Sequence, residues 1–152
     1  MSAPQDPRIS YVVARLDRAL RVAIAERLSP HGLTTLQYTT LSILGRRGQP
    51  LSNAQLARRA YMAPQSMSEV IAALQAKGLI KRRAHPNHRR VLPVALTPKG
   101  ERVLAECEQV VDALEDEMLG GVSAGERAAL LEALKGAVRA LGAGFTSAAS
   151  RQ

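Results

Sequence analysis

Residues 52–100 read SNAQLARRAYMAPQSMSEVIAALQAKGLIKRRAHPNHRRVLPVALTPKG, and this stretch decides the fold. Its first residues, 52–55, have the S-x-x-Q spacing of a capping box, which starts a short helix. Pro64 suits the first position of the next helix, and Gly78 suits the residue that follows its end. The apolar residues between them repeat at the spacing of one helix face: Met67, Val70, Ile71 and Leu74. The stretch therefore predicts a short helix, a turn and a second helix.

A strand-like period replaces the helical one after Gly78. Residues 80–85 and 91–96 are the two expected strands, and Pro86-Asn87 supplies the turn between them. One face of the second strand carries Leu92, Val94 and Leu96. Pro93 cannot donate to a ladder, which places this strand at an edge. Helix, turn, helix and basic hairpin form the order of a winged helix-turn-helix, whose second helix, ~10–12 Å wide, fits the ~12 Å major groove.

Further helices flank this stretch on both sides. Their expected starts are Asp6-Pro7, a capping box at Thr34–Gln37, Thr97-Pro98, and a third capping box at Ser123–Glu126. Their expected ends are Pro30 and Gly32, Gly48, Gly120-Gly121, and Gly142 and Gly144. The expected fold class is mainly α with a small β-wing: six helices in a single domain, 1–152, with a winged helix-turn-helix DNA-binding lobe at 34–97.

Charge is distributed unevenly along the 152 residues, whose formal net charge is +8 and whose pI is about 10.5. Residues 46–90 contain ten Lys and Arg and a single acid, Glu69, whereas residues 101–152 sum to −4. One lobe is therefore suited to an anionic partner, and double-stranded DNA is the expected one.

Cysteine usage and hydropathy indicate the compartment. The single Cys107 excludes an intrachain disulfide and fits a reducing environment. No apolar run reaches the ~18 residues that a membrane span needs, and residues 1–6 lack the apolar core of a signal peptide. We expect a cytoplasmic protein with no membrane partner.

The stretch from Leu56 to Gly100 resembles the MarR family, the multiple-antibiotic-resistance regulators. The residues that carry the resemblance are Leu56-Ala57, the run LQAKGLI at 74–80, Arg89-Arg90, and Leu96-Thr97-Pro98-Lys99-Gly100. The resemblance implies a homodimer built from the N- and C-terminal helices, here 7–30 and 98–145, and a small-molecule or redox signal read between the dimer and DNA lobes. The chain departs from the family pattern at Ala63, Glu69, Ala73, His85 and His88, so the DNA sequence read by relatives is not expected to transfer.

Candidate DNA-binding residues follow from the winged helix-turn-helix order. The first turns of the second helix carry Pro64, Gln65, Ser66, Ser68 and Glu69, off its apolar face. Gln can pair with adenine, Ser with either partner, and Glu can accept from cytosine, whereas the alternative is simple solvent exposure. Phosphate and wing contacts are expected from Ser52, Arg82, Arg83, His88, Arg89 and Arg90.

Candidate effector residues are Tyr11, His31 and Tyr38, because relatives often bind phenolic ligands near the first two helices; each can equally be a packing residue. Cys107 lies on an apolar stripe and is expected to be a small buried hydrophobe rather than a redox sensor. His85 and His88 have no third ligand nearby, so neither a metal nor another cofactor is expected. The sequence contains no G-x-S-x-G, H-E-x-x-H, P-loop, G-x-G-x-x-G or C-x-x-C pattern, and we do not expect an enzyme.

The leading functional hypothesis is a ligand-responsive transcriptional repressor that binds a pseudo-palindromic operator as a dimer. Leu130, Leu134 and Leu141 are expected to meet Ile9, Val13 and Leu16 across a two-fold axis. The alternative is a constitutive or architectural winged-helix module that binds DNA or protein without an effector. Sequence-specific binding that a small molecule abolishes distinguishes the first from the second.

Overall fold

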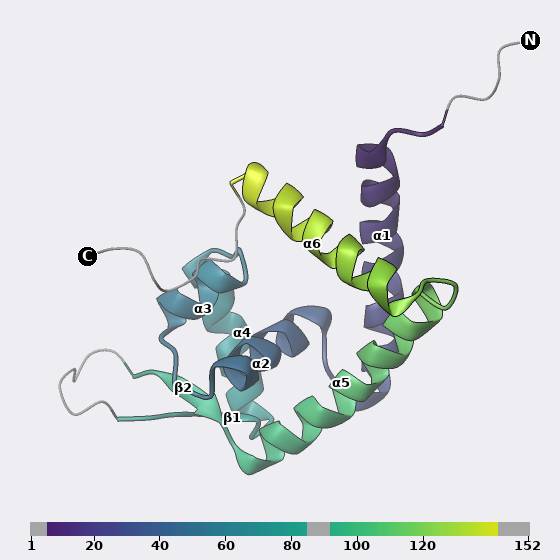
Figure 1. Cartoon of the computed structure of the whole chain (residues 1–152). Helices are drawn as coiled ribbons and strands as arrows, with labels where there is room; N and C mark the ends of the chain where they lie inside the picture. Colours follow the sequence, from purple (N-terminus) through teal and green to yellow (C-terminus); the bar gives the residue numbers. More distant parts are fainter. Residues whose placement is uncertain (1–5, 85–91, 143–152) are drawn as a thin grey trace, which may run out of the picture.

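The computed structural model of the chain describes residues 6–84 and 92–142 (Figure 1). The described elements, in chain order, are α1 (Ile9–Leu28), the 3-10 helix η1 (Ser29–His31), α2 (Thr35–Arg47), α3 (Asn53–Arg59), α4 (Pro64–Ala76), β1 (Ile80–Arg82), β2 (Val94–Leu96), α5 (Pro98–Met118) and α6 (Ala124–Ala140). The fold is therefore mainly α with a small β-wing, as the sequence predicts.

Local side-chain chemistry starts most of the helices. Capping boxes form at Thr34–Gln37, Ser52–Gln55 and Ser123–Glu126. In each box, the hydroxyl of the first residue accepts from the backbone N–H of the last residue. The Gln or Glu side chain of the last residue accepts from the backbone N–H of the first. All three capping boxes are confirmed. Pro64 and Pro98 occupy first-turn positions of α4 and α5, also as predicted.

The start of the first helix differs from the prediction, whereas its end agrees with it. Arg8, not Asp6, precedes α1, and it makes no side-chain cap hydrogen bond, so the expected cap at Asp6-Pro7 is wrong. Pro30 has no N–H to extend the α-helical ladder, and the chain tightens into η1 instead. Gly32 then turns the chain with φ of 69°, a left-handed conformation that costs glycine little.

The described hairpin is shorter than the sequence predicts. β1 and β2 pair antiparallel with Ile80 opposite Leu96, and the next bond, from Arg83 N–H to Pro93 O, is 2.7 Å. Val94 is fully buried, but Leu92 is 41% exposed and lies outside β2, so the expected common face for both is wrong. Leu51 forms an isolated antiparallel bridge with Val94, so Val94 pairs both with β1 and with this residue, which precedes α3.

One buried cluster joins the helix-turn-helix to its neighbours. It contains Leu28 from α1, Leu41 and Leu44 from α2, Leu56 from α3, Met67, Ile71 and Leu74 from α4, Val94 from β2, and Leu104 and Cys107 from α5. Burial raises the pKa of the Cys107 thiol, and the side chain is inaccessible to solvent, as expected of a packing residue. The rotation of α4 is fixed because its three buried residues face this cluster.

Apolar surface remains uncovered on α1 and α6. No residue of α6 is buried: its Leu130 and Leu134 are 41% and 40% exposed, and Leu141, which follows the helix, is 86% exposed. On α1, Ile9, Val13 and Leu16 are also exposed. In Figure 1, α1 and the start of α6 lie at the end of α5 that is far from the hairpin. None of the described helices is long and apolar enough to cross a membrane.

Candidate nucleic-acid interface

The start of α4 presents free polar groups to solvent. Gln65, Ser66 and Glu69 are exposed, because Met67, Ile71 and Leu74 occupy the opposite face in the core. Ala63 at the N-cap offers no side-chain acceptor to the first turn. The first backbone N–H groups of α4 are therefore available to an outside acceptor such as a phosphate oxygen.

Ser68 differs from its neighbours because its hydroxyl is already engaged. It donates to the carbonyl oxygen of Pro64 at 3.0 Å and accepts from Asn53 Nδ2 at 3.0 Å. Asn53 Nδ2 also donates to the same Pro64 oxygen at 3.2 Å. Ser68 thus braces the first turn of α4 against α3, which leaves Ser66 as the freer of the two hydroxyls.

Asn53 is a site residue that sequence reasoning missed. Its contact spans the turn between α3 and α4, where Tyr61 takes a φ of 54° and Met62 N–H bonds Ala57 O at 2.8 Å. No sequence spacing reports such a contact. The only available signal was an Asn directly after a capping Ser.

The hydroxyl and the backbone N–H of Ser52 are already hydrogen-bonded within the capping box of α3. Its hydroxyl accepts from Gln55 N–H at 3.2 Å, and its N–H donates to Gln55 Oε1 at 2.9 Å. The residue is half-buried. A phosphate contact from Ser52 therefore stays a prediction that competes with the capping box.

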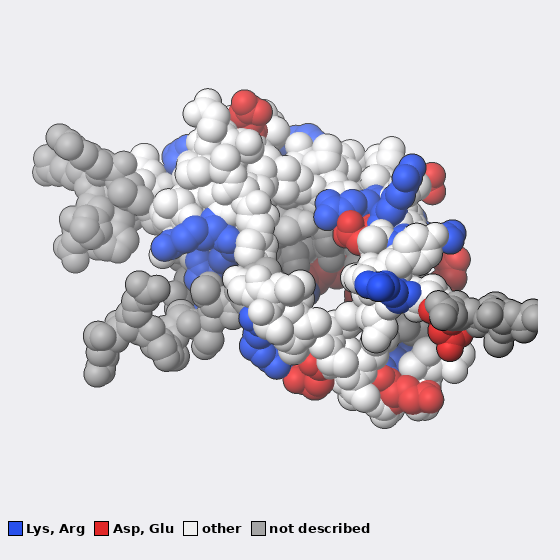
Figure 2. Space-filling model, turned by 90° about the horizontal axis from the view of Figure 1, so that it is seen from above, with Lys and Arg blue, Asp and Glu red and all other residues white. Residues whose placement is uncertain are grey.

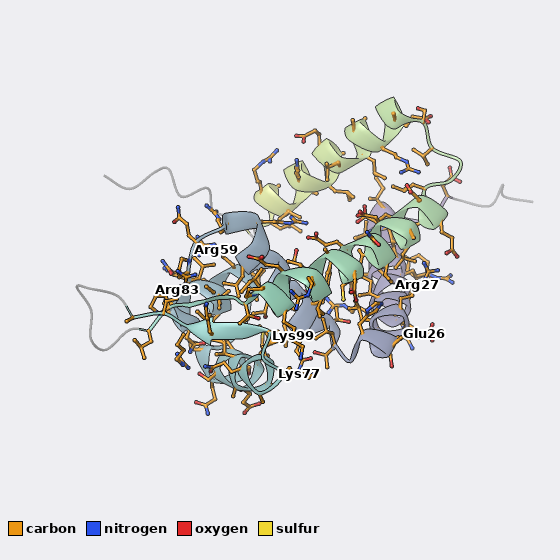
Figure 3. All side chains as sticks on the ribbon, turned by 90° about the horizontal axis from the view of Figure 1, so that it is seen from below. Glu26, Arg27, Arg59, Lys77, Arg83 and Lys99 are labelled. Atoms are coloured by element: carbon orange, nitrogen blue, oxygen red, sulfur yellow. The ribbon has the colours of Figure 1, made fainter. Side chains whose placement is uncertain are left out.

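Basic residues gather at the hairpin end of the molecule. Arg82 and Arg83 are exposed, and Arg82 Nη1 donates to Leu92 O at 3.3 Å. Burial lowers the pKa of the Arg59 guanidinium, and the positive charges of Arg47 and Arg58 lower it further. Figure 2 shows Lys and Arg clustered at this end, whereas both signs mix at the other, and Figure 3 labels Arg59 and Arg83 there. Unneutralised like charges of this kind attract an anion.

The wing tip lies outside the described residues. His88, Arg89 and Arg90, together with His85, fall in residues 85–91. Their proposed contacts with DNA stay predictions from the sequence.

The three candidate effector residues do not lie together in the structure of one chain. Tyr11 is exposed near the start of α1, where Arg15 lies over its ring at 5.8 Å. His31 follows the other end of this 20-residue helix, about 30 Å away at 1.5 Å per residue. His31 Nδ1 is 3.6 Å from Glu106 Oε2. Tyr38 is half-buried between α2 and α5, and burial, then the charge of Glu108, raises the pKa of its phenol.

A cleft of about 510 Å³ lies between the end of α2, the hairpin and α5. Leu44, Leu96 and Leu104 supply its apolar wall, Arg46 and Arg83 supply cations, and Glu101 and Glu108 supply carboxylates. Neither arginine side chain forms an ion pair within the part of the chain that the structure describes. Within residues 6–84 and 92–142, no cluster of three or more His, Cys, Asp or Glu could hold a metal.

These features define a winged helix-turn-helix DNA-binding protein: α4 is a recognition helix with an exposed polar start, a short hairpin follows it, and basic residues gather at the hairpin end of the molecule. Residues 31–91 match the MarR family. An HTH-type transcriptional repressor of Mycobacterium tuberculosis is 33% identical over 124 residues, which are 82% of this chain and 88% of that protein. The chain belongs to the MarR family, whose members are DNA-binding transcription regulators.

Solved structures of transcription regulators are similar to this chain as well. The transcriptional regulator BldR from Sulfolobus solfataricus is 30% identical, with 86% of this chain and 92% of that chain covered and a TM-score of 0.76. A MarR family protein from M. tuberculosis in complex with salicylic acid is 32% identical, with coverage of 87% and 97% and a TM-score of 0.68. Its complex with DNA is 31% identical, with coverage of 85% and 96% and a TM-score of 0.71.

Proposed function

We propose that this chain is a ligand-responsive transcriptional repressor that binds a pseudo-palindromic operator as a homodimer. The observation that carries the proposal is the start of α4, where Gln65, Ser66 and Glu69 project from a helix whose opposite face is held in the core. Side chains of this kind hydrogen-bond to base edges in the major groove. The mycobacterial relative solved with DNA supports the same use of the fold.

Dimerisation supplies the second recognition helix. The exposed leucines of α6 and the exposed aliphatic residues of α1 form an apolar surface that a second copy of the chain would cover. An isologous interface places the two α4 helices on half-sites related by the same two-fold axis. In this arrangement residues 34–97 contact DNA, and residues 7–30 and 98–145 form the dimer. A regulator of this kind acts on the chromosome, so the cytoplasm is its expected compartment.

The cleft beside the hairpin is the best candidate for the effector. A salicylate-like aromatic carboxylate would place its ring against Leu44 and Leu104 and its carboxylate near Arg46 and Arg83. The complex of the mycobacterial relative with salicylic acid supports this ligand class.

Salicylate is expected to release the protein from duplexes that it selects from a random-sequence DNA library. Ala105→Leu fills the cleft without changing its charge. It should leave DNA affinity unchanged and raise the salicylate concentration for half-release about tenfold, equivalent to about 1.4 kcal/mol. Fluorescence anisotropy of the labelled duplex measures both.

The matched control is Ala113→Leu, the same substitution at an exposed position of α5 outside the cleft. It should release DNA as the wild type does. If Ala105→Leu also behaves as the wild type, the cleft is not the effector site. If DNA stays bound at millimolar salicylate, this ligand class is wrong, and a constitutive DNA-binding module becomes the better account.

A further inference from the structure

The C-terminal end of the recognition helix is fastened through one lysine. Lys77 follows the last residue of α4. Its Nζ donates to the carbonyl oxygen of Gly32 and, at 2.9 Å, to Gln37 Oε1. Gly32 lies in the joint between η1 and α2, and Gln37 belongs to the capping box of α2. The ammonium group therefore ties the end of α4 to the joint between the first two α-helices.

The backbone carbonyls of Lys77 and of the two residues after it accept hydrogen bonds from the start of α5 and its N-cap. Lys99 Nζ donates to Lys77 O at 3.0 Å, and Thr97 Oγ1 donates to Gly78 O at 2.6 Å. Thr97 N–H donates to Leu79 O at 3.0 Å. Lys77 O is one of the carbonyl groups that a helix end leaves without an intrahelical partner, and the other two belong to the link between α4 and β1. Figure 3 shows Lys77 and Lys99 side by side on the underside of the molecule.

Lys77 is too far from the DNA-reading end of α4 to contact bases. It lies twelve residues after Gln65, about 18 Å along the helix. A small change of helix direction at Lys77 nevertheless displaces Gln65 and Ser66. Packing of Met67, Ile71 and Leu74 holds α4 in the core, but apolar packing is less directional than the hydrogen bonds at its end.

We infer that Lys77 is a positioning residue: it fixes the direction of the recognition helix by joining its end to the α1–α2 joint, while α5 holds the adjacent carbonyls. The inference rests on the proposed function, because it assigns the start of α4 to base recognition. It makes Lys77 a determinant of how well the protein discriminates between DNA sequences, without contacting DNA.

Lys77→Met tests this inference, because methionine keeps an unbranched apolar stem and removes the ammonium donors. Lys77 is exposed and the core is untouched, so the melting temperature should stay close to that of the wild type. Affinity for the selected duplex should fall about tenfold, because α4 is no longer held in the direction that presents Gln65 and Ser66 to the bases. Affinity for a duplex of random sequence should fall far less, so the ratio of the two affinities decreases.

Lys81→Met is the matched control. Lys81 is an exposed residue of β1 whose side chain has no hydrogen bond or ion pair with any described residue, and the variant loses the same charge. It should weaken binding to both duplexes equally and leave their affinity ratio unchanged. Lys77→Arg, which keeps donors at the same place, should restore most of the discrimination.

Binding constants for the four proteins on both duplexes, at one salt concentration, decide the matter. An unchanged affinity ratio in Lys77→Met overturns the inference, as does an equal loss of discrimination in Lys81→Met. Failure of Lys77→Arg to restore discrimination also contradicts it. If the wild type binds both duplexes equally well, the proposed function itself is wrong. This result can be told apart from the others because it concerns the wild type and not the variants.

Discussion

Leu134→Glu is expected to turn a dimer into a monomer and to lower affinity for operator DNA by roughly a hundredfold or more, the range that linked binding sites gain over single ones. In the single chain Leu134 is 40% exposed on a helix with no buried residue. Covering it with a second copy removes apolar surface from water, whereas a glutamate carboxylate there would have to be desolvated without a partner. Sedimentation velocity at micromolar concentration and a DNA titration measure the two effects.

Ala129→Glu is the control for this prediction. It adds the same charge to α6 at an exposed position on the opposite side of the helix. It should remain a dimer and bind DNA as the wild type does. A dimeric Leu134→Glu, or a wild type that is already monomeric, would contradict the proposed interface.

Gly100→Ala is expected to destabilise the protein by about 3 kcal/mol, the upper part of the range for overpacking. A Cβ at Gly100 would lie 2.0 Å from Leu79 O and 2.9 Å from Leu79 C, which are backbone atoms that no rotamer change can move. The same Leu79 oxygen accepts from Thr97 N–H, so relief of the clash would break the junction between α4, β1 and α5. Urea unfolding at a fixed protein concentration measures the free energy of unfolding.

Gly125→Ala provides the comparison. Gly125 also lies in the first turn of a helix, but a Cβ there meets no atom within 4 Å. Its replacement should be neutral or stabilise by about 0.4–1 kcal/mol, because alanine restricts the unfolded chain. If Gly100→Ala lowers the free energy of unfolding by less than about 1 kcal/mol, its effect is close to that of an ordinary surface substitution. The backbones of Gly100 and Leu79 can then separate at little cost, and the prediction is wrong.

The parts of the fold that were predictable from sequence depend on local chemistry. A capping box is formed by four consecutive residues, so Thr34–Gln37, Ser52–Gln55 and Ser123–Glu126 could all be identified correctly. The start of α1 could not, because a helix can begin without a side-chain cap, as it does after Arg8.

The parts that sequence could not predict depend on contacts between distant residues. The bridge from Leu51 to Val94 joins residues that are far apart in the sequence, and neither residue indicates the other. The bonds of Asn53 to Ser68 and of Lys77 to Gly32 depend on the turns between helices. Sequence patterns placed the exposed residues of α4 correctly, since periodicity alone assigns them to the polar face. Tyr11, His31 and Tyr38 were grouped by resemblance, which carries no information on how far apart α1, η1 and α2 place them.

In the proposed dimer, two copies of α4 read an inverted repeat in duplex DNA. The most direct test is selection of bound duplexes from a random-sequence library by the wild type and by Gln65→Ala/Ser66→Ala, followed by sequencing. The wild type should enrich an inverted repeat with half-site centres about 10 base pairs apart, or a multiple of this. The variant, which keeps the basic residues, should bind DNA but lose preferences within each half-site. If the wild type enriches no inverted repeat, or if the variant selects the same motif as the wild type, α4 does not read DNA in the way proposed.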